Sequence, residues 1–259
     1  MTTGGIECLI LAMRNHKQVA ELQSVLCNCL ANIAGLDVSY SNKIAAAGGI
    51  QSIVVAMKIH KDRYDLLAHA CTALNDLSLN ESNQAKIRVA GGIDALITAI
   101  HNMLQKLEHQ IPPNFKLLYS GSRALSSLCT DSANRTKFAG AGGIDCILLA
   151  MKHFKGEIKM QIWGCIIMEK LAAGSTELSE KVAAAGGILA VVGAMCNMEE
   201  DEDQQVLQLS ACNALKALAN VAANQEQIEQ AGTQFTCFTG TKVQILTLRT
   251  RRMARYRVF

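Results

Sequence analysis

A single tetrapeptide, Ala-Gly-Gly-Ile, recurs along the chain at nearly constant spacing, and this repetition constrains the fold more than any other feature. It occupies residues 47–50, 90–93, 141–144 and 185–188. A shortened copy begins at Gly4, and a degenerate copy ends the series at Gly232. Successive first glycines are separated by 44, 43, 51, 44 and 46 residues. Periods of about 40–47 residues indicate a helical solenoid, in which each repeat packs mainly against its neighbours.

The longest step, 51 residues, has a local cause. It contains a segment that the other periods lack, His109-Gln110-Ile111-Pro112-Pro113-Asn114. The chain has no other proline, and Ala, Leu, Ile, Gln, Glu and Lys dominate elsewhere. That composition favours helix, and β-branched residues do not alternate until the last segment. We therefore predict an all-α protein with an insertion at the two prolines.

Each period divides into three helical stretches. The first precedes the glycines, and three asparagines near its start are expected to act as N-caps by accepting from free amide groups: Asn83, Asn134 and Asn224. The Gly-Gly pair then ends this helix, because glycine adopts left-handed conformations at little cost and lets two helices approach closely. A largely apolar second helix follows, as in 50–57, then a polar loop and a third, longest helix.

The third helices contain three columns of constant character when they are aligned by period. The columns are Leu30, Leu74, Leu125, Met168 and Leu215; Ile33, Leu77, Leu128, Leu171 and Leu218; and Cys27, Cys71, Ser122, Cys165 and Cys212. Each repeat of a solenoid buries a stripe of side chains against its neighbours. We therefore expect these columns to face the interior, with the cysteines as small core residues rather than redox-active thiols.

Two other columns of the third helices vary freely. They are Asn28, Thr72, Arg123, Ile166 and Asn213, and, four residues later on the same helical face, Asn32, Asp76, Ser127, Lys170 and Ala217. Because these positions share no packing demand, we expect them to line a continuous surface. Trp163, three residues before Ile166, is interpreted either as a binding anchor on this surface or as a residue buried between repeats.

Over residues 4–232 the chain resembles the armadillo repeat family. The resemblance rests on the Ala-Gly-Gly-Ile junction, the Asn-Arg or Asn-Gln start of the first helix and the Leu-x-Asn-Ile pattern of the third. It implies a right-handed α-α superhelix of three-helix repeats, an armadillo-like solenoid, whose third helices line a concave groove for an extended peptide or a partner domain. In well-known members a ladder of asparagines holds the peptide backbone. Asn32 matches that ladder, and the residues that replace the others are Asp76, Ser127, Lys170 and Ala217.

The repeats divide the chain into segments. A partial repeat with a second and a third helix (1–38) precedes four repeats at 39–80, 81–131, 132–174 and 175–221, of which the second carries the Pro-Pro insertion. Residues 222–232 are expected to form the first helix of a truncated repeat. Because the series is cut at both ends, we expect the chain to be part of a longer repeat array.

Charge is distributed unevenly along the chain. After Gly232 there are six basic residues and no acidic one, while the other 19 basic and all 22 acidic residues give 1–232 a net charge of −3. We interpret 233–259 as a non-repeat basic tail that is disordered or β-prone; the alternatives are contact with nucleic acid or anionic lipid, and a misassembled reading frame. The acidic run 199–203 is interpreted as a solvated loop, with docking of a basic partner as the alternative.

The chain carries no motif typical of catalysis or metal binding. Its ten cysteines include no Cys-x-x-Cys or zinc spacing, and its histidines include no His-Glu-x-x-His pair. His60, His101 and His153 fall near the loop after the second helix and are interpreted as solvated. We find no signal-peptide pattern and no apolar run of the ~18 residues that a membrane span needs. We therefore predict a reduced, cytoplasmic protein, with the nucleus as an alternative location, and without enzymatic activity, cofactor or metal.

The varied columns predict the function. We expect a protein-binding scaffold or adaptor that holds a partner protein or extended peptide in the groove of third helices, without specific nucleic-acid binding. The candidate binding residues are Asn28, Asn32, Thr72, Asp76, Arg123, Ser127, Trp163, Ile166, Lys170 and Asn213. Two alternatives are open: a nuclear-transport-type adaptor for basic cargo, and the regulatory subunit of an enzyme.

Overall fold

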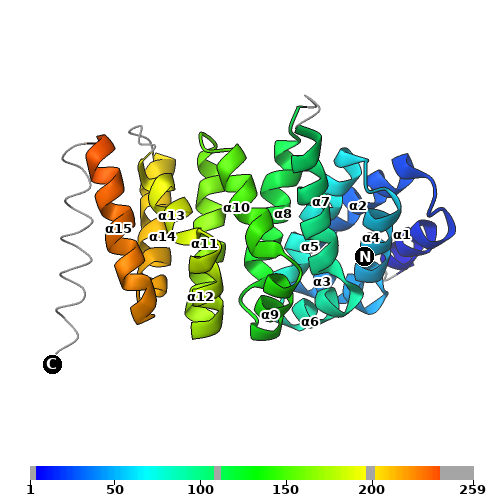
Figure 1. Ribbon diagram of the computed structural model, residues 1–259. Coiled ribbons are helices and arrows are strands. Elements are labelled where there is room, and N and C mark those ends of the chain that lie inside the picture. The colour runs from blue at the N-terminus through cyan, green and yellow to red at the C-terminus, as the bar shows by residue number, and fades with distance from the viewer. Residues whose placement is uncertain (1–3, 108–111, 197–201, 240–259) are drawn as a thin grey trace. The chain divides into compact units, whose positions relative to one another are not determined.

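The computed structural model describes residues 4–107, 112–196 and 202–239 (Figure 1). Within these residues the regular structure consists of fifteen helices and no strand. The helices group into two compact units, unit 1 (residues 1–146) and unit 2 (residues 147–259), and the boundary falls inside one helix. The predicted all-α solenoid of three-helix repeats is therefore confirmed.

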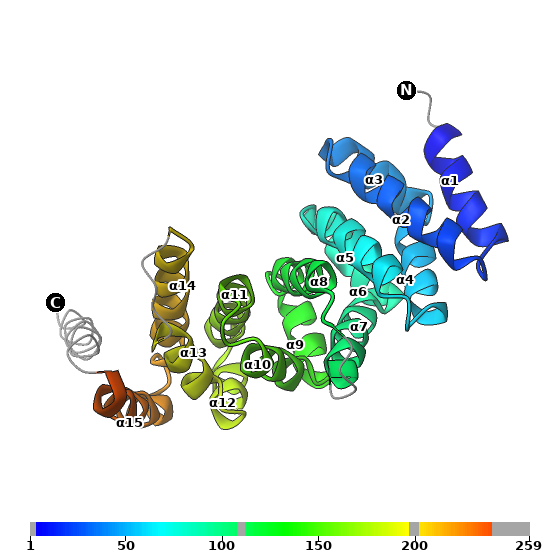
Figure 2. The same ribbon diagram turned by 90° about the horizontal axis from the view of Figure 1, so that it is seen from above.

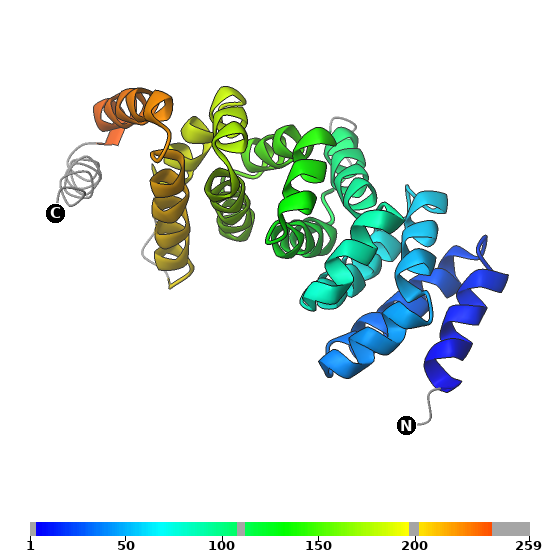
Figure 3. The ribbon, with the colours of Figure 1, turned by 90° about the horizontal axis from the view of Figure 1, so that it is seen from below.

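Unit 1 contains three successive sets of second, third and first helices. In chain order they are α1 (Gly4–Asn15), α2 (Ala20–Ala34), α3 (Val38–Ala46), α4 (Gly49–Ile59), α5 (Tyr64–Ser78), α6 (Glu81–Ala90), α7 (Gly92–Leu107), α8 (Phe115–Leu128) and α9 (Ser132–Gly140). The third helices α2, α5 and α8 lie side by side in this unit, as Figure 2 and, from the opposite side, Figure 3 show. The prolines precede α8, whose N-cap Asn114 accepts from the amide of Leu117.

Unit 2 repeats the same order of helices. α10 (Gly143–His153) contains the boundary between the units, and it is followed by α11 (Ile158–Gly174), α12 (Thr176–Ala184), α13 (Gly187–Cys196), α14 (Glu202–Leu218) and α15 (Ala222–Thr239). The third helices of this unit, α11 and α14, pack against each other. α14 begins at Glu202, the fourth residue of the acidic run, so the last residues of that run belong to the first turn of this helix, where acidic residues are favourable.

The two glycines of each junction have different tasks. The first glycine has a positive φ at all four junctions: 85° at Gly48, 81° at Gly91, 76° at Gly142 and 89° at Gly186. The second glycine lets the next helix start against the preceding one. A Cβ on Gly49 would stand 2.5 Å from Ile44 Cγ2 and 2.9 Å from the Ile44 carbonyl oxygen. The predicted left-handed turn and close helix approach are both confirmed.

The prediction that Asn83, Asn134 and Asn224 are N-caps is wrong. The first helices begin three residues earlier, so that Asn80 caps α6 and Asp131 caps α9. The three predicted caps are buried, and each donates from Nδ2 to a carbonyl at the end of the preceding third helix. The acceptors are Leu77 at 3.3 Å, Leu128 at 3.1 Å and Leu218 at 3.0 Å. These amides therefore join the third helix of one repeat to the first helix that follows.

The constant columns form the core of both units. Leu30, Leu74, Leu125, Met168 and Leu215 are all buried. In the other two columns the exceptions are Ile33 and Cys212, which are partly exposed. They belong to α2 and α14, and each of these helices has a third-helix neighbour on one side only within its unit. The columns are therefore buried by contact between neighbouring third helices, as predicted.

The repeat pattern ends less abruptly than expected. α15 continues through Gly232 to Thr239, so the expectation of disordered or β-prone chain is wrong for 233–239. The physical reason is that Thr233 stands where the earlier junctions have a second glycine, and the described backbone has no left-handed glycine at this junction. The remainder of the predicted basic tail, 240–259, lies outside the described residues.

Within the described segments, no single helix is long and apolar enough to cross a bilayer. One consecutive pair, Thr176–Ala184 and Gly187–Met195, meets the criterion of length and composition only when taken together, and the two helices are bent by 71°.

Candidate partner-binding face

The third helices of unit 1 carry six of the candidate binding residues on one face. Small side chains let these helices pack closely: a Cβ on Gly121 of α8 would stand 3.1 Å from Ile100 Cδ1 and 3.6 Å from Cys71 Sγ of α5. Above this packed layer lie the candidates, which we call the unit 1 face: Asn28, Asn32, Thr72, Asp76, Arg123 and Ser127. Asn32 and Arg123 are exposed, and the other four are partly exposed.

Polar contacts link neighbouring third helices along the unit 1 face. Ser24 Oγ of α2 lies 3.0 Å from His69 Nδ1 of α5. Thr72 Oγ1 of α5 lies 3.0 Å from Ser120 Oγ of α8 and 2.9 Å from the Ala68 carbonyl oxygen. Burial, together with the nearby positive charge of Lys116, lowers the pKa of His69. The imidazole of His69 therefore favours its neutral form at this contact between α2 and α5.

Asp76 is the acidic residue of the unit 1 face, and its surroundings are rich in hydrogen-bond acceptors. Burial raises the pKa of its carboxyl, although a hydrogen bond from Asn75 and the charge of Arg123 oppose that shift. Asn75 Nδ2 donates to Asp76 Oδ1 at 2.8 Å. The other end of the same amide, Asn75 Oδ1, is buried and finds no hydrogen-bond partner among the described residues. One buried acceptor thus stands without a donor directly beside the carboxylate.

The remaining candidates lie on α11 and α14 and form the unit 2 face: Trp163, Ile166, Lys170 and Asn213. All four are partly exposed, so Trp163 is neither fully buried nor fully presented. Ala217, the last member of the second varied column, is buried instead and interrupts that column. α11 needs a glycine here too, because a Cβ on Gly164 would collide with the Met151 sulfur.

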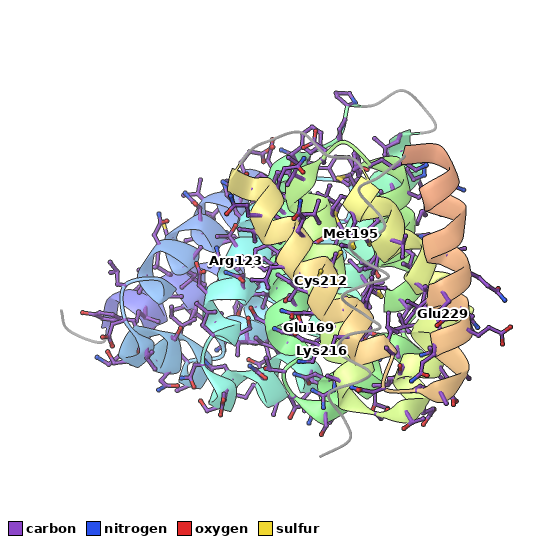
Figure 4. All side chains as sticks on the ribbon, turned by 90° about the vertical axis from the view of Figure 1, so that its left-hand side faces the viewer. Arg123, Glu169, Met195, Cys212, Lys216 and Glu229 are labelled. Carbon is purple, nitrogen blue, oxygen red and sulfur yellow. The ribbon has the colours of Figure 1, made fainter. Side chains whose placement is uncertain are left out.

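One column of charged side chains in unit 2 was not singled out from the sequence. In the position after the constant leucine, unit 1 has three small or amide residues, all buried: Ala31, Asn75 and Ser126. Unit 2 has Glu169 and Lys216 at that position; Glu169 is partly exposed and Lys216 is exposed. Figure 4 shows Glu169 on α11, and Cys212 and Lys216 on α14. The change from small to charged residues is the sequence signal that could have identified them.

The cysteine column is a packing feature. Burial raises the pKa of three thiols of this column, Cys27, Cys71 and Cys165, to about 12, and it does the same for the thiol of Cys146 on α10. They are therefore protonated at neutral pH, and a protonated thiol is a poor nucleophile and a poor metal ligand. The interpretation of this column as small core residues is confirmed for these buried members.

The histidines do not converge on one site. His16, His101 and His153 are exposed, and His60 Nε2 contacts the Lys17 carbonyl oxygen at 2.7 Å. His109 and three residues of the acidic run, 199–201, lie outside the described residues. Within the residues that the structure does describe, no group of three or more His, Cys, Asp or Glu side chains could hold a metal ion.

Comparisons with known proteins identify the fold. No protein-family model and no curated protein matches the sequence. Among solved structures, an engineered protein has a TM-score of 0.73 and 20% identity, covering 92% of this chain and 93% of its own. A designed armadillo repeat protein has a TM-score of 0.71 and 16% identity over 92% and 94% of the two chains.

A second designed armadillo repeat protein was solved in complex with the peptide (KR)4. It has a TM-score of 0.67 and 16% identity, and it covers 83% of this chain and 82% of its own. At such identities the likeness concerns the fold alone. Together with the repeat period and the glycine junctions, these comparisons show that the chain folds as an armadillo-like α-solenoid.

Proposed function

We propose that the chain is a repeat scaffold that binds an extended segment of a partner protein along its third helices. The observation that carries this proposal is the unit 1 face. Three adjacent helices bury the same columns of side chains, yet they present six solvent-accessible residues of five types at the two positions between those columns. A surface whose chemistry changes at each repeat is suited to recognising a specific order of side chains in a bound peptide.

The chemistry of the unit 1 face suits a peptide ligand. Asn28 and Asn32 each offer a donor and an acceptor, Asp76 offers acceptors, and Arg123 offers only donors. Main-chain amides and carbonyls of an extended segment need such partners at regular intervals. The structure with (KR)4 supports the proposal, because it indicates that a designed protein of this fold can be occupied by a peptide.

A small-molecule site has less support. A cavity between α4 and α7 has a volume of ≈ 170 Å³ and is lined by Met57, Lys58, Lys61, Leu67, Asp94, Ala95, Thr98, Ala99 and Asn102. Sites for drug-sized ligands typically measure about 300–1,000 Å³. Asp94 at its edge is paired with Lys137 at 2.7 Å rather than presented for chemistry. We therefore propose that the chain is not an enzyme. We also propose a location in the reducing cytoplasm, which the free, buried thiols support.

Selection from a random-peptide display library, with the full chain as bait, tests the proposal. Enriched peptides should bind the wild type and lose most of their affinity for a triple variant, Asn28→Ala, Asn32→Ala and Arg123→Glu. Lys86→Ala is the matched control, because Lys86 is exposed on the first helix α6, outside the third helices. Equal affinity for the wild type and the triple variant would count against the third-helix face as the binding surface.

A transport-type adaptor for basic cargo is the second candidate. The (KR)4 peptide of the designed neighbour favours it, whereas Arg123 on the unit 1 face repels a uniformly basic ligand. Titration of the full chain with (KR)4 separates the two. Saturable binding that Asp76→Asn weakens would favour basic cargo, and the lack of saturable binding would remove this candidate.

A further inference from the structure

Opposite charges stand on neighbouring third helices of unit 1. Asp76 lies on α5 and Arg123 on α8, two helices that pack against each other. We propose that the unit 1 face selects extended segments carrying one basic and one acidic side chain about three residues apart, with the basic side chain at Asp76 and the acidic one at Arg123. This inference rests on the proposed peptide-binding function and names the class of ligand.

The surroundings of Asp76 call for a cationic donor. Asp76 Oδ1 already accepts from Asn75, whereas Asp76 Oδ2 lies beside the end of α2, where a Cβ on Gly35 would be 3.7 Å from it. The same Cβ would be 3.6 Å from the Ala31 carbonyl oxygen, so the negative end of the α2 dipole lies close by. An ammonium or guanidinium group supplies the donors and the positive charge that this acceptor cluster lacks.

Arg123 has the complementary property. Its side chain is exposed, and it makes no hydrogen bond or ion pair with any residue that the structure describes. Its charge acts on Asp76 from a distance, and burial still raises the pKa of that carboxyl, so the two residues do not neutralise each other in a direct ion pair. A guanidinium binds a carboxylate with two parallel hydrogen bonds, which makes an acidic side chain its best ligand.

The spacing of the two charges in the ligand follows from helix packing and from the geometry of an extended polyproline II segment. Axes of packed helices are about 8–10 Å apart, and a polyproline II chain advances about 3.1 Å per residue with about three residues per turn, so side chains three residues apart lie on the same side of the segment. A segment that crosses α5 and α8 therefore presents side chains about three residues apart to the two positions. A uniformly basic segment would place a like charge on Arg123, and a uniformly acidic one would place it on Asp76, so both are disfavoured.

Four synthetic peptides in one uncharged, extended background test this inference with the full chain. They carry Arg-x-x-Glu, Glu-x-x-Arg, Arg-x-x-Arg and Glu-x-x-Glu. Because a bound segment has one direction, one of the two mixed orders should bind about tenfold more tightly than the other three peptides. The charge-exchanged variant, Asp76→Arg with Arg123→Glu, should instead favour the other mixed order.

Two single variants keep the test decisive if the exchanged variant does not fold, which circular dichroism will show. Asp76→Asn should lose the preference for the basic side chain and keep that for the acidic one, and Arg123→Gln should do the reverse. Equal affinity for all four peptides, or an order preference that survives the charge exchange, overturns the inference while the scaffold function stands. Failure of all four to bind also overturns it, and the display selection then decides separately whether the chain binds peptides at all.

Discussion

The unit 1 face and the unit 2 face share one architecture and differ in chemistry. Unit 1 presents a carboxylate, a guanidinium and small polar groups over a layer in which Ala31, Asn75 and Ser126 are buried. Unit 2 presents Trp163 and Ile166, and the column that is buried in unit 1 carries charges there. The comparison shows that surface chemistry varies between the units at these exposed positions, whereas the buried leucine and small-residue columns hold the third helices together in both units.

The difference also has a consequence for binding. Contacts to Asp76 and Arg123 are electrostatic and weaken with added salt, whereas contacts to an aromatic and an aliphatic side chain depend on buried area. We therefore expect ligands of the two faces to differ in salt dependence as well as in sequence. Substitutions at shared and at differing positions test how far the two units agree in architecture and in chemistry.

The largest effect is expected at the second glycine of a junction, the feature that both units share. In unit 2, a Cβ on Gly187 would stand 2.5 Å from Val182 Cγ1 and 2.8 Å from the Val182 carbonyl oxygen. Gly187→Val should therefore destabilise this unit by about 3 kcal/mol through overpacking. Hydrogen exchange followed by peptide should show the loss of protection mainly in α12 and α13. Gly5→Val is the control, because nothing lies within 4 Å of a Cβ there.

A smaller loss is expected at the buried asparagines that join third to first helices. Asn134 donates to Leu128 and accepts from Arg88 at 2.8 Å, so Asn134→Ala should cost about 2 kcal/mol. Asn83 makes the equivalent donation, but its Oδ1 has no partner in the described structure, so Asn83→Ala should cost only about 1 kcal/mol. Urea unfolding measures both. A larger loss for Asn83→Ala would show that the buried oxygen does not explain the difference.

The sequence was sufficient for features that repeat and insufficient for those that depend on one neighbour. The Gly-Gly pair seen at Gly48 and Gly49 occurs at four junctions, and this repetition revealed the helix break. The role of Asn83 was missed because an N-cap residue and a residue three positions later both lie near the start of a helix. Only the backbone conformation shows which of the two is the cap. Asn75 is buried because of the helices packed against it. Nothing in the two varied sequence columns predicted this burial. Neither does any break in the pattern mark the boundary between units inside α10.

A change of moderate size and opposite sign is expected at Asp76. Burial raises the pKa of this carboxyl in the folded state, so the folded state binds its proton more tightly than the unfolded chain does. The stability from this group is complete below the unfolded pKa of about 3.9 and is lost as the pH rises through the folded value. Asp76→Asn should therefore unfold at a higher temperature than the wild type at pH 7, with the difference gone near pH 3. A lower midpoint at pH 7 would contradict the acceptor-rich surroundings proposed for this residue.

The smallest effect is expected at Glu177 in unit 2, where the substitution should change stability in the opposite direction to Asp76→Asn in unit 1. The hydrogen bond and charge of Lys181, whose Nζ lies 2.7 Å from Glu177 Oε1, lower the pKa of this exposed carboxyl. Its stabilising contribution is therefore present above the unfolded pKa of about 4.3 and is lost as the pH falls through the lower folded value. Glu177→Gln should lower the unfolding midpoint slightly at pH 7 and not at all near pH 2. Because the pair is exposed, 0.5 M salt should remove most of this effect, whereas the gain from Asp76→Asn, which arises from burial, should persist in the same salt.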